Sequence, residues 1–263
     1  MEIKKIGSFS LSLRDDGVAF LTMDVPGEST NTLRSEFVSE AKEIIAAIRA
    51  ERRIQGIVLR SGKPDSFVVG ADINMLKAVQ RPEQAEALSR EGHAVMKELQ
   101  DLNLPLVAAI HGPALGGGLE FALCCHERVM TDDPKTIVGL PEVQLGVLPG
   151  GGGTQRLPKL IGIPAALDMM LTGKQVRAKQ ALKSGLADEV VPKANLEKAA
   201  VKRVHALIKK GHLQSYFDKP RKPAPALSGA GAMRLALESN PFGRNVIFEK
   251  ARKAVRAKTL GNY

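Results

Sequence analysis

The first part of the chain alternates short apolar runs with a longer segment of helical spacing. Residues 9–13 and 18–23 are apolar runs separated by Arg-Asp-Asp-Gly, which is typical of a turn between two antiparallel strands. Residues 35–49 carry apolar side chains at spacings of three and four, which predicts an amphipathic helix, and residues 56–59 form a further short strand. This order of strand, helix and strand predicts α/β layering with parallel crossovers.

The same alternation continues through the middle of the chain. Residues 106–110 form another bounded apolar run, and residues 117–125 predict a helix that is entered through glycines. Residues 128–131 and 136–138 resume short extended segments. The α/β pattern therefore extends to about residue 138.

Beyond residue 154 the spacing of apolar residues becomes helical. Four segments show it, and glycine or proline separates them: residues 154–161, 164–171, 177–184 and 196–209. Residues 218–231 contain three prolines and two glycines, which predicts an extended linker, and residues 242–260 predict a final basic helix. We expect a catalytic core over residues 1–192 and a helical, basic region over residues 193–263.

The net charge of +10 is unevenly distributed. Residues 1–192 carry 22 Lys and Arg against 24 Asp and Glu, whereas residues 193–263 carry 16 against 4. The simpler interpretation of this basic segment is a solvated surface or a surface that packs on another element, and the alternative is a nucleic-acid-binding surface. Two tyrosines and no tryptophan in the whole chain argue against nucleic acid as a partner, because stacking platforms for bases are scarce.

Apolar runs and cysteines bear on the cellular setting. The longest apolar runs, such as residues 106–110 and 121–125, fall far short of the roughly 20 residues that span a bilayer, and the N-terminus has no apolar signal core. Cys124 and Cys125 are adjacent in an apolar segment, which favours buried reduced thiols over a disulfide framework. We expect a cytoplasmic protein without a membrane partner.

Two glutamates beside glycine-rich stretches are the main candidates for chemistry. Glu120 ends the sequence Leu-Gly-Gly-Gly-Leu-Glu, and Glu142 follows Gly-Leu-Pro shortly before the glycine run at 149–153. Carboxylates beside exposed backbone amides suit acid–base chemistry on a substrate that develops negative charge. Glycines alone more simply allow close packing, but the Gly117 amide at a helix start would lie near Glu120 and favour an anion.

A second loop offers another backbone amide. Residues 66–73, Ser-Phe-Val-Val-Gly-Ala-Asp-Ile, contain a glycine that frees the backbone. Two such amides converging on a thioester oxygen would form an oxyanion hole.

Other familiar sites are excluded. Gly173-Lys174 has part of a phosphate loop, but Gln175 replaces the metal-binding hydroxyl. The glycines do not match the spacing of a dinucleotide fingerprint, and no cysteine or histidine cluster has metal-ligand spacing. His111 lacks a nucleophile elbow and is best interpreted as structural. The residues therefore predict neither a nicotinamide cofactor nor a metal site.

Three motifs together resemble the crotonase, or enoyl-CoA hydratase/isomerase, superfamily, and the resemblance covers essentially residues 10–195. They are Gly-Ala-Asp-Ile at 70–73, the segment ending in Gly-Gly-Gly-Leu-Glu at 109–120, and the segment at 140–157 that contains Pro-Gly-Gly-Gly-Gly-Thr-Gln-Arg. The resemblance implies an α/β fold built as a ClpP-like spiral of ββα units with a C-terminal helical region. It also implies a coenzyme A thioester as the substrate and no cofactor.

The resemblance implies a role for each matching residue. The amides of Ala71 and Gly117 would hold the thioester carbonyl, Glu120 would activate water, and Glu142 would protonate the α carbon. The Gly150 amide would help to hold the water. Contacts with the coenzyme A moiety are expected from the loop residues Phe67, Val69, Gly70, Asp72 and Ile73.

The expected reaction is syn addition of water to trans-2-enoyl-CoA in fatty-acid β-oxidation, and Δ3-Δ2-enoyl-CoA isomerisation is a further expectation. The alternatives are another crotonase reaction, such as thioester hydrolysis or decarboxylation, and RNA binding on a hydratase scaffold. More narrowly, residues 131–136 and 171–182 resemble the hydratase module of the fused hydratase/3-hydroxyacyl-CoA dehydrogenases, the α subunits of bacterial fatty-acid oxidation complexes.

That narrower resemblance implies partners. We expect a 3-hydroxyacyl-CoA dehydrogenase module in the full-length enzyme and a thiolase β subunit beside it. The trimer usual for free-standing relatives is one option for the oligomeric state. The final helix resembles the linker helix of the fused enzymes, so we expect the chain to correspond to one module of a longer enzyme.

Overall fold

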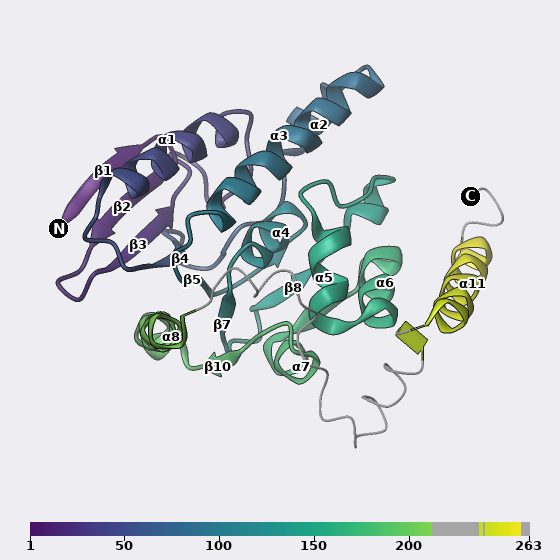
Figure 1. Ribbon diagram of the computed structural model, residues 1–263. Helices are drawn as coiled ribbons and strands as arrows, with labels where there is room; N and C mark the ends of the chain where they lie inside the picture. Colours follow the sequence, from purple (N-terminus) through teal and green to yellow (C-terminus); the bar gives the residue numbers. More distant parts are fainter. Residues whose placement is uncertain (212–236, 239, 259–263) are drawn as a thin grey trace.

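The computed structural model describes residues 1–211, 237, 238 and 240–258 (Figure 1). The strands are β1 (Glu2–Ile6), β2 (Phe9–Leu13), β3 (Val18–Met23), β4 (Gly56–Ser61), β5 (Leu106–Ile110), β6 (Ala114–Leu115), β7 (Glu127–Thr131), β8 (Ile137–Gly139), β9 (Gln175–Arg177) and β10 (Glu189–Val191). The helices are α1 (Phe37–Ala50), α2 (Ile73–Lys77), α3 (Pro82–Gln100), α4 (Gly117–Leu123), α5 (Gly153–Ile161), α6 (Ile163–Thr172), α7 (Ala178–Ser184), α8 (Leu196–Lys210) and α11 (Pro241–Lys258). Two 3₁₀ turns are η1 (Glu142–Leu145) and η2 (Lys193–Asn195).

The larger sheet has the strand order β1-β2-β3-β4-β5-β7-β10. Its first three strands pair antiparallel, and the pairs from β3 to β10 are parallel. The β2–β3 connection turns at Gly17, whose φ of +79° is a left-handed conformation that glycine adopts without strain. The predicted hairpin and the predicted parallel crossovers are both confirmed, whereas β1 was not predicted.

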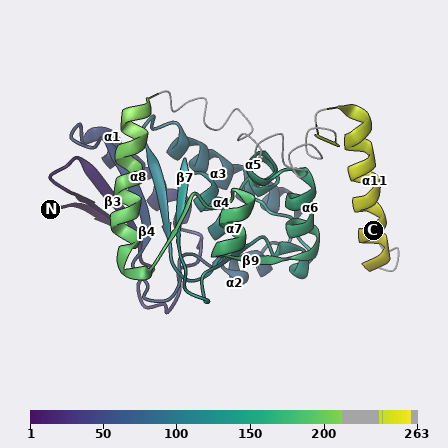
Figure 2. The same cartoon turned by 90° about the horizontal axis from the view of Figure 1, so that it is seen from below.

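Helices cover both faces of this sheet. α1 lies against β1 and β2 and contacts α3, and α8 crosses the opposite face over β4, β5 and β7 (Figures 1 and 2). The α8 side forms its own apolar core from Val18, Phe20, Val58, Val107, Ala109, Val129, Leu196, Ala199, Ala200, Val201, Val204 and Leu207. Strands buried on both faces explain why their sequences read as continuous apolar runs. The division predicted at residue 192 falls just before α8, which packs on the sheet of the preceding segment.

The later helices stand beside a small sheet of order β6-β8-β9. α5 and α6 contact each other, and α11 contacts α6 (Figure 2). Ile247 of α11 is buried. The helix predicted at 242–260 is confirmed over its described residues, and the linker predicted at 218–231 lies outside the residues that the structure describes. None of the described helices is long and apolar enough to cross a membrane.

The sequence analysis missed α2 and α3. α3 is 19 residues long, but only Val95, Met96 and Leu99 are buried, all in its last two turns. Its first half therefore carries no apolar stripe that spacing could reveal. This helix matters because its exposed face borders the candidate site.

Candidate active site

Glu120 lies in the first turn of α4, and its side chain is only 2% exposed. The helix starts after Gly116, whose φ of +53° suits glycine. A Cβ atom on Gly118 would come within 2.0 Å of the Val68 carbonyl oxygen, so glycine is required where α4 meets the loop at 66–72. The glycines thus let the start of α4 pack against that loop. The carboxylate of Glu120 is buried in the first turn of the helix as a result.

The carboxylate of Glu120 is held by two backbone amides of the later glycine run. The Gly151 amide donates to Oε2 at 2.8 Å, and the Gly153 amide donates to Oε1 at 2.7 Å. Gly153 is the first residue of α5, where unsatisfied amides and the helix dipole favour an anion. The sequence analysis associated this carboxylate with the Gly117 amide, but the hydrogen bonds that it accepts come from Gly151 and Gly153.

Burial and these amides act on Glu120 in opposite directions. Desolvation by burial raises the pKa of Glu120 above its ordinary value, and the amides of Gly153 and Gly151 offset part of the rise. The positive charge of Arg156 and the nearby His93 also lower the pKa of Glu120. The site therefore supplies stabilisation to the ionised form of a deeply buried carboxyl.

Glu142 lies at the start of η1 in a different environment. Both carboxyl oxygens are buried, and neither has a hydrogen-bond partner among the described residues. Burial, together with the smaller effect of the charge of Glu120, raises the pKa of Glu142 to about 7. A carboxyl with these properties can carry a proton near neutral pH and can also release it.

The two glutamates belong to one site. A Cβ atom on Gly116 would lie 3.3 Å from Oε1 of Glu142, which places that carboxyl against the start of the helix that carries Glu120. The charge of Glu120 is also one of the causes that raise the pKa of Glu142. The structure therefore brings together the pair that the sequence analysis singled out.

The amides of Ala71 and Gly117 also come together. Ala71 forms an isolated parallel bridge with Leu33, in which Leu33 bonds to the carbonyl of Gly70 and to the amide of Asp72. A Cβ atom on Gly117 would lie 3.8 Å from the Ala71 amide nitrogen. Within the part of the chain that the structure describes, neither amide donates a hydrogen bond. Two unsatisfied amides at this junction suit an oxyanion.

The loop residues predicted to contact coenzyme A differ in accessibility. Phe67 is fully buried in the core, and its backbone amide and carbonyl are bonded to Pro113 and Asn31. The Val69 amide bonds to the carbonyl of Asn31, and Gly70 has a φ of +102°. The Asp72 carboxylate caps α2 by accepting from the Asn74 amide, and Ile73 is half exposed. These positions do not test the predicted contacts, which stay a prediction.

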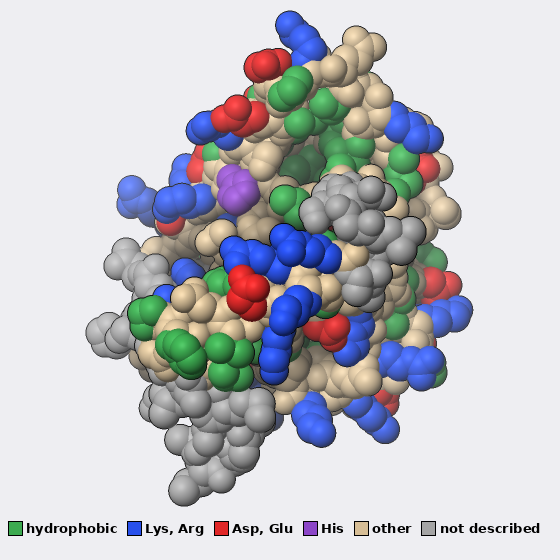
Figure 3. Space-filling view, turned by 90° about the vertical axis from the view of Figure 1, so that its right-hand side faces the viewer, with side chains coloured by type: hydrophobic (Ala, Val, Ile, Leu, Met, Phe, Trp, Pro, Cys, Tyr) green, Lys and Arg blue, Asp and Glu red, His purple; other side chains and the backbone are tan. Residues whose placement is uncertain are grey.

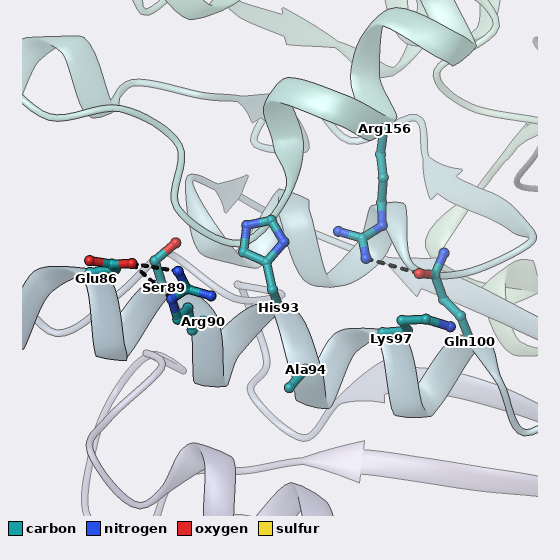
Figure 4. A pocket seen from close by; sticks show the side chains of 8 residues that line it. All are labelled: Glu86, Ser89, Arg90, His93, Ala94, Lys97, Gln100 and Arg156. Atoms are coloured by element: carbon teal, nitrogen blue, oxygen red, sulfur yellow. Dashed lines mark hydrogen bonds and ion pairs between the residues drawn. The ribbon is translucent and has the colours of Figure 1, made fainter.

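Gly150, predicted to hold water, begins the loop that binds Glu120. Its carbonyl oxygen accepts a hydrogen bond of 2.7 Å from the Ser89 hydroxyl of α3. Ser89 belongs to a groove of about 710 Å³ between α3 and α5, lined by Glu86, Ser89, Arg90, His93, Ala94, Lys97, Gln100 and Arg156 (Figure 4). The sequence analysis missed this groove because it did not predict α3.

Apolar side chains are exposed next to Glu142. Four residues of η1 and the segment after it expose large apolar side chains: Val143, Leu145, Val147 and Leu148, the last of them 75% exposed. On the α11 side of the molecule, Figure 3 shows hydrophobic side chains gathered around a hollow, with basic side chains below it. An apolar surface beside a titratable carboxyl suits a substrate with an acyl chain.

The remaining candidates have structural roles. Cys124 and Cys125 are buried and free, as predicted, and burial raises the pKa of Cys124 to about 12. His111 is buried with Nε2 bonded to the Lys63 carbonyl, which fits its structural interpretation. Among the described residues no three His, Cys, Asp or Glu side chains are placed to hold a metal ion.

The sequence matches the family model described as Enoyl-CoA hydratase/isomerase over residues 14–244. Among curated relatives, "Fatty acid oxidation complex subunit alpha" of Shewanella putrefaciens is 55% identical over 256 residues, and that of Shewanella amazonensis is 57% identical. Each match covers 97% of this chain. The chain spans only 34% of the length of these relatives.

Solved structures agree on the fold. The enoyl-CoA hydratase of Bacillus anthracis is 26% identical with a TM-score of 0.69, and the match covers 94% of this chain and 90% of the other. Pseudomonas aeruginosa DspI is 28% identical with a TM-score of 0.70, covering 91% and 95%. The expected crotonase fold with its C-terminal helical region is confirmed.

Proposed function

The chain belongs to the enoyl-CoA hydratase/isomerase family, and from this premise we propose that it adds water in syn fashion to trans-2-enoyl-CoA, giving 3-hydroxyacyl-CoA. One observation carries the proposal. Two buried carboxyls share one site, Glu120 with both oxygens held by amides and Glu142 with neither held. Hydration needs a fixed base and a separate acid, and these two environments suit those roles.

In the proposed mechanism the amides of Ala71 and Gly117 bind the thioester oxygen. Addition of water at C3 shifts electrons through the conjugated system, so negative charge develops on that oxygen as an enolate forms. Each oxyanion donor contributes roughly 10²- to 10³-fold to such a reaction. Within the described part of the chain neither amide donates a hydrogen bond to another group, which supports a role in binding the thioester oxygen.

Protons move through the two glutamates. Ionised Glu120 accepts a proton from water as the water oxygen bonds to C3, and protonated Glu142 donates its proton to C2, which completes the 3-hydroxyacyl product. The pKa of about 7 for Glu142 supports its protonation near neutral pH. We assign the Gly150 amide to the water, and we assign Val69, Gly70, Asp72 and Ile73 to the coenzyme A moiety, with Phe67 supporting their loop from the core. The reaction requires no cofactor beyond the substrate.

Δ3-Δ2-enoyl-CoA isomerisation is the second candidate activity. It requires one group that removes a proton from C2 and returns it to C4. Glu142 supports this reaction because its carboxyl oxygens have no hydrogen-bond partner among the described residues and titrate near neutrality.

We also propose that the chain acts as a module of a longer enzyme. The relatives named as α subunits of a fatty acid oxidation complex are about three times as long. A 3-hydroxyacyl-CoA dehydrogenase module would use the hydration product, a thiolase β subunit would follow it, and a cytoplasmic location would suit both. Phe242 of α11, which is 79% exposed, supports packing against such a neighbour.

The test is a hydration assay on trans-2-enoyl-CoA thioesters of increasing chain length. Wild type is expected to hydrate them, and the Glu120→Gln/Glu142→Gln double variant is the matched inactive control. Wild type that hydrates none of them, but hydrolyses or decarboxylates other acyl-CoA thioesters, would overturn the proposal in favour of another crotonase reaction. Binding of generic RNA at physiological salt without hydration would favour the nucleic-acid alternative.

A further inference from the structure

The glycine loop that binds Glu120 is itself held from outside by polar side chains. Ser89 of α3 donates to the carbonyl of Gly150 at 2.7 Å. Arg156 of α5 donates through Nη1 to the carbonyl of Gly151 at 2.8 Å, and through Nη2 to Oε1 of Gln100 at 2.9 Å. Figure 4 shows Arg156 reaching from α5 toward Gln100 on α3. One guanidinium thus ties the loop to the long helix.

The bonds from Ser89 and Arg156 act on two successive peptide groups of the loop, the first of which donates to the catalytic carboxylate. The carbonyl of Gly150 and the amide of Gly151 belong to one planar peptide group, so Ser89 at one end fixes the direction of the N–H that Glu120 accepts at the other. Arg156 fixes the next peptide plane through the carbonyl of Gly151, and this plane links the two amides, those of Gly151 and Gly153, that Glu120 accepts from. Hydrogen bonds in such a chain also polarise one another.

The local sequence makes room for this arrangement. A Cβ atom on Gly152 would come within 2.1 Å of Nη1 of Arg156, and Gly152 has a φ of +101°. Only glycine therefore lets the guanidinium fold back over the loop from the first turns of α5. This contact explains why the third residue of the four-glycine run is glycine.

We propose that Arg156 is a positioning residue for the hydration reaction, assisted by Gln100 and Ser89, and that it holds the peptide group between the two amides that orient Glu120. The inference rests on the proposed function. It goes further by assigning the outer face of α3 and the guanidinium of α5 to the geometry of the water-activating carboxylate.

Charge gives Arg156 a second, separable effect. The groups whose charge acts on Glu120 are Arg156 from α5 and His93 from α3. The charge of Glu120 acts in turn on the carboxyl of Glu142 in η1 and on the buried thiol of Cys124 just after α4. The positive charge of Arg156 lowers the pKa of Glu120 against the effect of burial. Loss of that charge therefore raises the pKa of Glu120, and a higher pH is needed to ionise the base.

The experiment measures kcat, KM and the acidic limb of kcat/KM for crotonyl-CoA hydration in wild type and four variants. Arg156→Met should lower kcat by on the order of 10²-fold, since misplacement of a catalytic group by about 1 Å has that effect, and should move the acidic limb to higher pH. Arg156→Lys keeps the charge but loses the two-pronged fork, so the limb should stay in place while kcat recovers only in part. Ser89→Ala should lower kcat several-fold without moving the limb.

Arg90→Met is the matched control. Arg90 lies in the same groove and bonds to Glu86, with no contact to the glycine loop, so the same loss of charge should leave kcat and the limb unchanged. Unchanged kcat and limb in folded Arg156→Met, with only a lower melting temperature, would overturn the proposal. If that variant does not fold, Gln100→Met removes only the second anchor, and unchanged kcat there would count equally against it. Failure of the proposed function is distinct, because wild type itself would then be inactive.

Discussion

Glu120 and Glu142 are the same residue type in two opposite settings. Glu120 is 2% exposed, and both its oxygens accept amide hydrogen bonds, whereas the oxygens of Glu142 accept none from the described residues. The first setting holds an anion in one orientation. The second setting leaves the carboxyl of Glu142 without a hydrogen-bond partner among the described residues that would compete for its proton. In the proposed mechanism this difference in backbone amides, and not the carboxyl itself, decides which group acts as base and which as acid.

The two settings also differ in their supports. Glu120 is placed by the buried start of α4 and by the start of α5, while Glu142 begins a single 3₁₀ turn followed by exposed apolar side chains. Substitutions that affect one carboxyl should therefore leave a measurable part of the other carboxyl's chemistry intact.

The largest effect should come from exchanging each carboxyl for its amide. Glu142→Gln should lose both hydration and isomerisation by roughly 10²- to 10⁴-fold, because it removes the group that moves the carbon-bound proton. Glu120→Gln should lose hydration to a similar extent but keep part of the isomerisation, which needs no activated water. Assays of both activities in both variants measure the difference. Equal loss of both activities in Glu120→Gln would contradict the division of roles.

The next effect concerns the loop around Glu120. Gly153→Ala would place a Cβ atom 3.0 Å from Oε1 of Glu120 and 2.9 Å from Cδ1 of Leu140, so the leucine methyl must shift and the carboxylate must give by a few tenths of an ångström. Hydration should fall by about tenfold, less than the roughly 10²-fold of a 1 Å displacement, and isomerisation through Glu142 should fall less. Steady-state kinetics of the two reactions compare them. An equal fall would mean that the loop supports both carboxyls.

The dependence of activity on pH should also distinguish the two carboxyls, with a smaller effect than the substitutions above. The proposed mechanism of hydration needs protonated Glu142, whose pKa is about 7, so kcat/KM should fall by roughly tenfold for each pH unit above that value. The charge of Glu120 raises the pKa of Glu142, so in Glu120→Gln the titration of Glu142 should move to lower pH. The pH dependence of the residual isomerisation activity in Glu120→Gln measures this shift. An unmoved profile would show that the two carboxyls do not interact.

The smallest effect comes from adding the same methyl group elsewhere. A Cβ atom on Gly92, inside α3, would meet no atom within 4 Å. Gly92→Ala should therefore stabilise the protein by about 1 kcal/mol through helix propensity and leave both activities unchanged. Urea denaturation measures the gain. If Gly92→Ala also reduces activity, this variant cannot serve as the control for Gly153→Ala.

Local patterns predicted much of this molecule, and contacts distant in sequence explain the rest. The hairpin, the parallel crossovers and the buried thiols depend on short-range spacing, and each was predicted. The role of Gly151 and Gly153 was missed because they lie 31 and 33 residues from the carboxylate that they bind, and spacing carries no information on such contacts. α3 was missed because most of its surface is polar. Ser89 was missed with it, and the role of Arg156, in the helix predicted at 154–161, was missed because it depends on contacts with α3 and the glycine loop.

The paired thiols behind α4 have a practical consequence. Cys124 and Cys125 are the only cysteines in the chain, both are buried, and burial keeps the Cys124 thiol protonated far above neutral pH. Maleimide reagents should therefore leave the native protein unlabelled. A single cysteine introduced in place of exposed Lys97 would then carry a fluorophore alone, and its emission would report events in the groove in real time.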